Sequence, residues 1–239
     1  MPPAPDARPS AALFDLDDTL YAERAFVDGG FRAVGRLLAP RVGRSAAWID
    51  RRLRVLHDRD GRGRLFDALL AELGVTDDPA LVSAAVVAYR THEPRLRPFE
   101  GVIPGLDRVR AAGIPTGLVS DGLASVQRRK LAALPGLAER LDVIVMTDEL
   151  GPGHAKPSPS GFLVACELLG VDPRRAVYVA NDPRKDFDGA RAAGLGTIRT
   201  GLLPDEGGSM HISTGDGHDA AAAAASFDDV VELLLGERR

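Results

Sequence analysis

The feature that most constrains the fold is the alternation of short apolar segments with amphipathic helical patterns after Pro98. An apolar run at 11–16 supplies one predicted strand, and further strands are predicted at 114–120, 141–146, 176–180 and 196–200. Strands separated by helices pair in parallel, and a parallel sheet is covered by helices on both faces. The sequence therefore predicts an α/β fold with a Rossmann-like parallel sheet.

Residues 22–97 have a different pattern, with apolar residues at helical spacing and no predicted strand. Four helices fit this region, and the last begins at Asp78-Pro79, a capping residue followed by proline at the first helical position. We predict a discontinuous α/β core domain, residues 1–21 and 98–239, interrupted by a small helical cap domain at 22–97.

Composition narrows the class of protein. The net charge of −4 and the aromatic content of 5% argue against a nucleic-acid partner. No run of eighteen apolar residues is present, so no membrane span is expected. The single cysteine, Cys166, fits a reducing cytoplasm. The segment 201–226 is rich in Gly, Ser and Ala and is predicted as a long loop; whether it covers the site, contacts a second subunit in a homodimer or has no role is left open.

The basic residues are mostly arginine. Only Lys130, Lys156 and Lys185 are lysines, and the other 27 are arginines. Because a compact ammonium and a planar guanidinium are not interchangeable at a site, each lysine is worth locating.

Polar residues gather after the predicted strands. In parallel sheets the ligand site lies beyond the carboxyl ends of the strands. Asp15 and Asp17 end the first strand, two residues apart, so one carboxylate could attack and bind a metal while the other moves protons. After later strands come Ser120 with Asp121, then Lys156 in a proline-braced loop, and then the acidic loop 181–186.

These motifs resemble those of the haloacid dehalogenase-like hydrolases. FDLDDTLY at 14–21 matches the DxDxT signature of that superfamily. Ser120, Lys156 with its following proline, and the loop 181–186 match its later motifs in order, and KDFDGARAAGLGTIRT at 185–200 is similar to its closing segment. The helical region resembles the C1-type cap of the subfamily I phosphatases.

The resemblance implies a phosphatase that acts on a small phosphorylated metabolite. It implies that Asp15 attacks phosphorus and is transiently phosphorylated, while Asp17 first protonates the leaving oxygen and then activates water. It assigns phosphate binding to Thr19, Ser120, Asp121 and Lys156, with Lys156 also offsetting negative charge in catalysis. It implies Mg²⁺ held by oxygen atoms from Asp15, Asp17 and the 181–186 loop, with candidates Asn181, Asp182 and Asp186.

One position departs from the family pattern. Where the first aspartate of the metal loop is expected, the chain has Asn181, and the acid follows as Asp182. Either Asn181 supplies its amide oxygen or the loop shifts so that Asp182 binds; we favour Asp182 slightly, with Asp186 as the outer acidic ligand. A chain with weakened catalysis, retained as a binding or regulatory protein, stays an alternative for this reason.

Single residues help to distinguish a phosphatase from enzymes of the superfamily that catalyse other reactions. A phosphomutase would use the same aspartates and is not excluded. A dehalogenase is disfavoured because the dehalogenases of the superfamily have no acidic residue at the position that Asp17 occupies in this chain. A phosphonatase is disfavoured because it needs a cap lysine, and residues 21–98 contain none. Sugar phosphates, nucleotides and small phosphorylated acids all remain open as substrates.

Overall fold

A computed structural model describes residues 8–75, 78–201 and 220–237 of the chain. The chain divides into two compact units. One comprises Met1–Ala22 and Arg97–Arg239, and the other comprises Glu23–Leu96. The boundaries lie next to those predicted from the change in hydrophobic period.

The first unit is built on a parallel sheet of six strands in the order β3-β2-β1-β4-β5-β6. This confirms the predicted α/β class with a Rossmann-like sheet, and the first strand lies inside it, between β2 and β4. The strands are β1 (Ala11–Phe14), β2 (Thr116–Ser120), β3 (Val143–Met146), β4 (Ala176–Ala180), β5 (Gly196–Thr200) and β6 (Ala222–Ala224).

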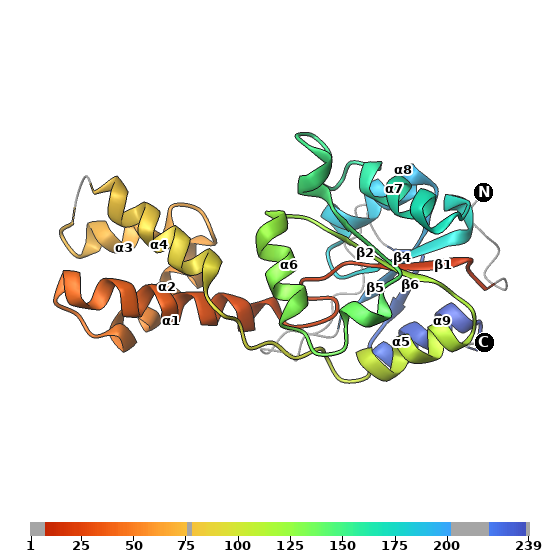
Figure 1. Cartoon of the computed structure of the whole chain (residues 1–239), viewed down its shortest axis with the longest axis horizontal. Helices are drawn as coiled ribbons and strands as arrows, with labels where there is room; N and C mark the ends of the chain where they lie inside the picture. The colour runs from red at the N-terminus through yellow and green to blue at the C-terminus, as the bar shows by residue number, and fades with distance from the viewer. Residues whose placement is uncertain (1–7, 76–77, 202–219, 238–239) are drawn as a thin grey trace. The chain divides into compact units, whose positions relative to one another are not determined.

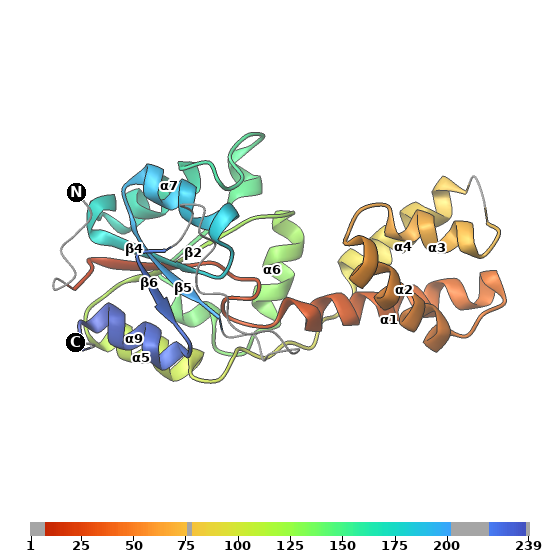
Figure 2. The same ribbon diagram turned by 180° about the vertical axis from the view of Figure 1, so that it is seen from behind.

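Helices cover both faces of the sheet (Figure 1 and Figure 2). Helices α7 (Ser160–Leu169) and α8 (Asp188–Ala193) pack together on one face, and α5 (Val102–Ala111) and α9 (Phe227–Leu235) pack together on the other. Helix α6 (Ala124–Ala132) follows β2. Phe162 of α7 and Tyr178 of β4 are fully buried between layers, with ring centroids 4.7 Å apart. The strands are apolar on both sides because both faces are covered.

The structure corrects the predicted loop 201–226. Residues 202–219 lie outside the described residues, but Ala222–Ala224 form β6, paired in parallel with β5. Alanine favours helices and the segment has no period of two, so local pattern does not indicate a strand. Pairing with β5 supplies the hydrogen bonds, and the burial of Ala224 supplies the apolar contact. Helix α8 is preceded by a π-helical turn at Pro183–Phe187.

The second unit contains the four helices predicted for this region: α1 (Glu23–Val42), α2 (Ala46–Asp60), α3 (Leu65–Glu72) and α4 (Pro79–Thr91). Its core is a separate cluster centred on residues such as Phe31, Ile49, Leu53 and Leu69, all almost completely buried. The Asp78 carboxylate accepts a hydrogen bond from the amide of Leu81 and caps α4, as its position before Pro79 predicts.

None of the helices in the described parts of the chain has the length and apolar content that crossing a membrane requires.

Candidate active site

The site forms at the carboxyl ends of β1, β2 and β4. Asp15 follows β1 directly, and its amide donates to the carbonyl of Val179 in β4 at 3.0 Å. This hydrogen bond continues the sheet ladder by one residue, so the Asp15 side chain starts from a rigid position. Only 3% of Asp15 is exposed. A carboxylate with so little water around it requires a charged partner from elsewhere in the chain.

Lys156 supplies that charge. Its ammonium lies 2.5 Å from Asp15 Oδ1 and 2.6 Å from Asp186 Oδ1, with the side chain completely buried. The loop that carries it is held by hydrogen bonds from the Lys156 amide to the Asp121 carboxylate at 3.2 and 3.1 Å. Gly189 of α8 permits this loop to approach, because a Cβ there would lie 2.4 Å from the Pro157 carbonyl oxygen. Two carboxylates therefore share one ammonium.

Burial and the neighbouring charges keep Lys156 protonated, and they let Asp15 lose its proton only at a higher pH than an exposed aspartate would. Burial raises the pKa of Asp15 to about 6; Asp186 adds to the rise and Lys156 opposes it. Burial alone would lower the pKa of Lys156, but Asp15 and Asp186 outweigh it and hold that pKa above its usual value. At neutral pH both Asp15 and Lys156 are ionised.

Tyr178 completes this buried network and was not predicted from the sequence. Its hydroxyl accepts a hydrogen bond from Lys156 Nζ at 2.9 Å and lies 3.3 Å from both Asp186 Oδ1 and the carbonyl of Val119. Burial, followed by the negative charges of Asp15 and Asp186, raises the pKa of Tyr178 well above its usual value, so the phenol stays protonated. In sequence it is one apolar-looking residue of β4, which is why pattern alone assigns it to the core.

Asp17 has a different set of partners. Lys130 Nζ lies 2.8 Å from each Asp17 oxygen, and Gln127 Nε2 donates to Asp17 Oδ2 at 2.9 Å. The Tyr21 hydroxyl donates to the other oxygen. Burial opposes ionisation of Asp17, but Lys130 and these hydrogen bonds outweigh it and lower its pKa. Gln127 and Lys130 were missed as site residues, although the scarcity of lysine marked Lys130 as a position to locate.

The phosphate-binding candidates lie beside these two aspartates. Ser120 ends β2, is 1% exposed, and its hydroxyl accepts from Gln127 Nε2 at 2.7 Å. The Asp121 carboxylate accepts from Thr147 at 2.6 Å as well as from the Lys156 amide, so it braces the lysine loop. The Thr19 hydroxyl is buried and donates to Asn181 Oδ1 at 3.4 Å.

In the loop after β4, the side chains of Asn181 and Asp182 have different partners. The Asn181 amide oxygen faces Thr19. The Asp182 carboxylate instead accepts from the amide of Arg184 at 3.1 Å and caps the turn that follows, and Asp182 is exposed. Its backbone amide donates to Asp186 Oδ2 at 3.2 Å. These contacts place the oxygen of Asn181, rather than the carboxylate of Asp182, toward the DxDxT loop.

The donor set suits a hard cation. Carboxylate, amide and backbone carbonyl oxygens are the ligands that Mg²⁺ prefers. No cluster of three or more His, Cys, Asp or Glu side chains placed to hold a metal occurs among the described residues. A metal at this site would therefore rely on the Asn181 amide and the Asp17 carbonyl besides Asp15.

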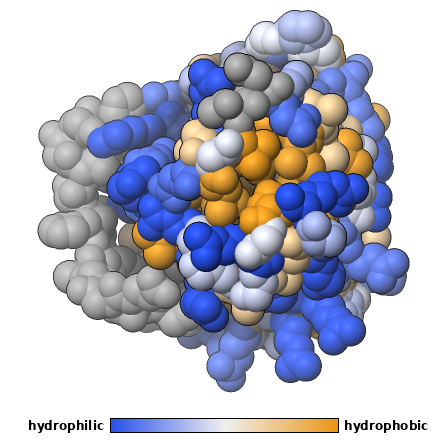
Figure 3. All heavy atoms as spheres, turned by 90° about the vertical axis from the view of Figure 1, so that its left-hand side faces the viewer, coloured by the Kyte–Doolittle hydropathy of each residue, from blue (hydrophilic) through white to orange (hydrophobic). Residues whose placement is uncertain are grey.

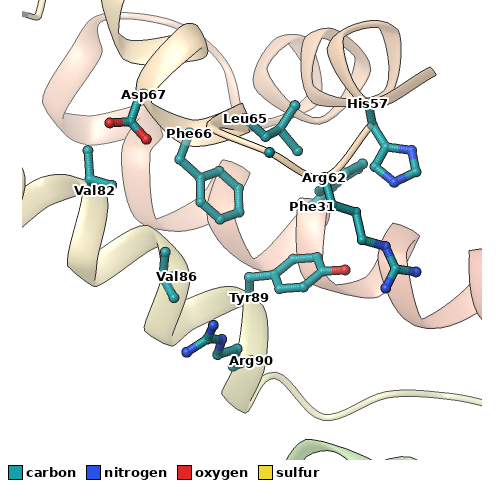
Figure 4. A pocket seen from close by; sticks show the side chains of 11 residues that line it. Phe31, His57, Arg62, Leu65, Phe66, Asp67, Val82, Val86, Tyr89 and Arg90 are labelled. Carbon is teal, nitrogen blue, oxygen red and sulfur yellow. The ribbon is translucent and has the colours of Figure 1, made fainter. Parts of the chain in front are cut away.

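The helical unit contains a cavity of its own, of about 270 Å³ (Figure 4). The rings of Phe66 and Tyr89 pack with centroids 5.9 Å apart, and the Tyr89 hydroxyl points toward Arg62. Apolar side chains also gather on the surface of this unit, bordered by hydrophilic residues (Figure 3). The cavity lining combines apolar and charged side chains: Phe31, His57, Arg62, Leu65, Phe66, Asp67, Val82, Val86, Tyr89 and Arg90.

Comparison with known proteins agrees with this geometry. The sequence model of a hydrolase family, the haloacid dehalogenase-like hydrolases, matches residues 9–194. A glyceraldehyde 3-phosphate phosphatase of Methanopyrus kandleri is 37% identical over 195 residues, 79% of this chain and 82% of the relative. A phosphoserine phosphatase of Thermus thermophilus is 32% identical over 168 residues, 69% of this chain and 65% of the relative.

A solved structure shares the fold. It is a HAD family hydrolase from Deinococcus radiodurans with bound phosphate and sodium, which superposes with a TM-score of 0.68 at 22% identity and covers 96% of both chains.

Proposed function

Since the chain belongs to the haloacid dehalogenase-like hydrolases, we propose that it is a Mg²⁺-dependent phosphohydrolase that forms an aspartyl phosphate on Asp15. The relatives named above are phosphatases, which makes this chain an enzyme of the same class, a phosphoric monoester hydrolase. The observation that carries the proposal is the pair of aspartates in unequal surroundings. Asp15 is buried against Lys156, and Asp17, two residues later, faces α6.

The reaction divides between these two carboxylates. In the first half, an Asp15 oxygen bonds to phosphorus while the bond to the leaving oxygen breaks, and Asp17 gives that oxygen a proton. In the second half, Asp17 takes a proton from the water that attacks the phosphoryl group, which releases phosphate and frees Asp15. Thr19 and Ser120 hydrogen-bond the phosphoryl oxygens, and Lys156 offsets the negative charge that collects around Asp15.

The oxygen donors at the site fit Mg²⁺. Asp15, the backbone carbonyl of Asp17 and Asn181 would hold it, with Asp186 as the outer acid. When bound, the ion supplies positive charge next to the phosphoryl group. Because an amide replaces a carboxylate at Asn181, the site carries one negative charge fewer, and Mg²⁺ is expected to bind more weakly than to an all-carboxylate set. The Asp182 contacts with Arg184 support Asn181 over Asp182 in this role.

The substrate is a small phosphate ester. The relatives act on glyceraldehyde 3-phosphate and phosphoserine, so these two compounds are the first to test. The helical unit is proposed to select the molecule. Its cavity, with Tyr89 between aromatic and arginine side chains, supports this role. A cytoplasmic location, a homodimer and the absence of a nucleic-acid partner stay predictions.

The test compares the wild-type protein with Asp15→Asn on an aryl phosphate, with Mg²⁺ and with EDTA. We expect metal-dependent turnover that falls at least ~10³-fold in the variant, since the nucleophile is lost. Asp107→Asn is the matched control, because Asp107 is exposed and pairs with Arg140 on the surface. Full turnover by Asp15→Asn would contradict the proposal. No hydrolysis by the wild type, together with phosphoryl transfer between two sugar positions, would indicate a phosphomutase.

A further inference from the structure

Helix α6 carries two buried polar side chains on one face. Gln127 and Lys130 are three residues apart, and they are 2% and 4% exposed. Their neighbours Arg128 and Arg129 are exposed. Burying an amide and an ammonium on a short helix costs free energy unless each has a specific partner. We therefore expect this face of α6 to lie against a charged group.

That partner is Asp17, far away in sequence. Lys130 contacts both Asp17 oxygens at 2.8 Å, and Gln127 contacts one of them at 2.9 Å. Tyr21, from the segment after the DxDxT loop, donates to the remaining oxygen. Every one of these groups is a donor. While it is ionised, as the second half of the reaction requires, the Asp17 carboxylate is therefore held as an acceptor in a single orientation.

Gln127 also reaches the phosphate-binding hydroxyl. Its Nε2 donates to Ser120 Oγ at 2.7 Å as well as to Asp17. When the Ser120 oxygen accepts from Gln127, its own hydrogen is left to donate to a phosphoryl oxygen. One side chain thus orients two groups that come from different strand ends.

We propose that Gln127 and Lys130 are positioning residues that hold Asp17 as the acceptor for the proton of the attacking water, so that hydrolysis of the aspartyl phosphate depends on α6. This inference rests on the proposed function, because it concerns the second half of that reaction. The contacts that join Gln127 and Lys130 to the site are those with Asp17 and Ser120, so we expect their effect on catalysis to act through these two side chains.

The two halves of the reaction can be separated with 4-nitrophenyl phosphate. Its leaving group departs as a stable anion and needs no proton, so phosphorylation of Asp15 depends little on Asp17. Hydrolysis of the aspartyl phosphate needs Asp17 as a base whatever the substrate was. Loss of the α6 contacts should therefore slow the second half and spare the first, which makes the phosphorylated enzyme accumulate.

The experiment is rapid-mixing release of 4-nitrophenolate by wild type, Lys130→Met and Gln127→Leu, with Mg²⁺. For both variants we expect a larger burst, approaching one product per enzyme, and a steady-state rate lower by roughly tenfold or more. Acid-quenched enzyme should carry more covalent phosphate. Arg129→Met is the matched control: it removes the same charge from the exposed face of the same helix and should match the wild type.

The outcomes are distinct. Burst and steady-state rates that fall by the same factor, or that do not change, would overturn the inference, because damage to the fold or to binding slows both phases. Lys130→Gln, which keeps a donor and changes the core less, tests the same point if Lys130→Met does not fold. A wild-type protein that hydrolyses no ester would overturn the proposed function and this inference with it, whereas wild-type turnover with unchanged variants overturns the inference alone.

Discussion

The two units of this protein use their basic residues differently. In the helical unit every basic residue other than histidine is an arginine, and the described ion pairs, such as Arg52–Glu72 and Arg24–Asp58, are at least partly exposed. In the α/β unit all three lysines face carboxylates of the candidate site. Lys156 pairs with Asp15 and Asp186, Lys130 with Asp17, and Lys185 lies 3.9 Å from Asp121.

The difference shows what each cation does well. A guanidinium is planar and binds a carboxylate in two places at a surface, as Arg52 does with Glu72. An ammonium is compact and can lie between two carboxylates, or against both oxygens of one, inside a packed core. The two buried lysines of this chain, Lys130 and Lys156, lie where a compact ammonium contacts two carboxylate oxygens at once.

Replacing the central lysine should have the largest effect on stability. Lys156→Met leaves Asp15 and Asp186 facing each other without a counter-charge, and breaking a buried pair in this way costs about 3–5 kcal/mol. The free energy of unfolding in urea measures it, and the loss should shrink as the pH is lowered and the carboxyls protonate. Lys185→Met, at a half-exposed site, is the control and should unfold close to the wild type. Equal losses in both variants would contradict the distinction between the two lysines.

The pH dependence should follow Asp15. Its pKa in the folded protein, about 6, is raised chiefly by burial, so the proton stays on Asp15 up to higher pH than on an exposed aspartate. The nucleophile and the metal both need the ionised form. Mg²⁺ affinity, measured by titration calorimetry from pH 5 to 8, should therefore fall as the pH drops through about 6, approaching tenfold per pH unit below it. An affinity that stays constant down to pH 5 would show that Lys156 outweighs burial.

Tyr178→Phe should have a smaller effect. It removes one hydroxyl from the Lys156 network while the ring still packs on Phe162, so we expect a loss of about 1–2 kcal/mol in unfolding free energy. If the hydroxyl also orients Lys156, kcat should fall more than KM changes. Tyr89→Phe, in the helical unit, serves as a comparison for the unfolding free energy that the loss of a tyrosine hydroxyl costs.

The smallest effect is expected from the arginine pairs. Arg54→Met removes contacts with Asp28 and Asp50 at the surface of the helical unit, where Arg54 is about one quarter exposed. Such pairs contribute about 0.5–1 kcal/mol, and the contribution should weaken in high salt. Thermal unfolding at low and high ionic strength measures it. A loss as large as that of Lys156→Met would remove the contrast between the two units.

Much of this protein follows from local sequence. The period of the apolar residues predicts which segments are strands and which are helices, because each element must bury a face of its own. The DxDxT motif places Asp15 and Asp17 at the end of β1, and Lys156, Ser120 and the 181–186 loop follow from their positions at other strand ends. These residues carry a recognisable signal because their spacing is short and their types are unusual beside a strand.

Contacts between residues that are far apart in the sequence could be identified only from the tertiary structure. Lys130 and Asp17 are 113 residues apart, and nothing in the sequence around either one predicts the other. Tyr178 looks like a core residue until Lys156 is placed against its hydroxyl, and the choice between Asn181 and Asp182 depends on which side chain the following turn uses as its cap. Likewise, Ala222–Ala224 become a strand only because β5 offers an edge to pair with. Local pattern determines the elements and the motifs, whereas the partners of a buried charge or an unpaired strand edge are decided by which distant segments the fold brings beside them.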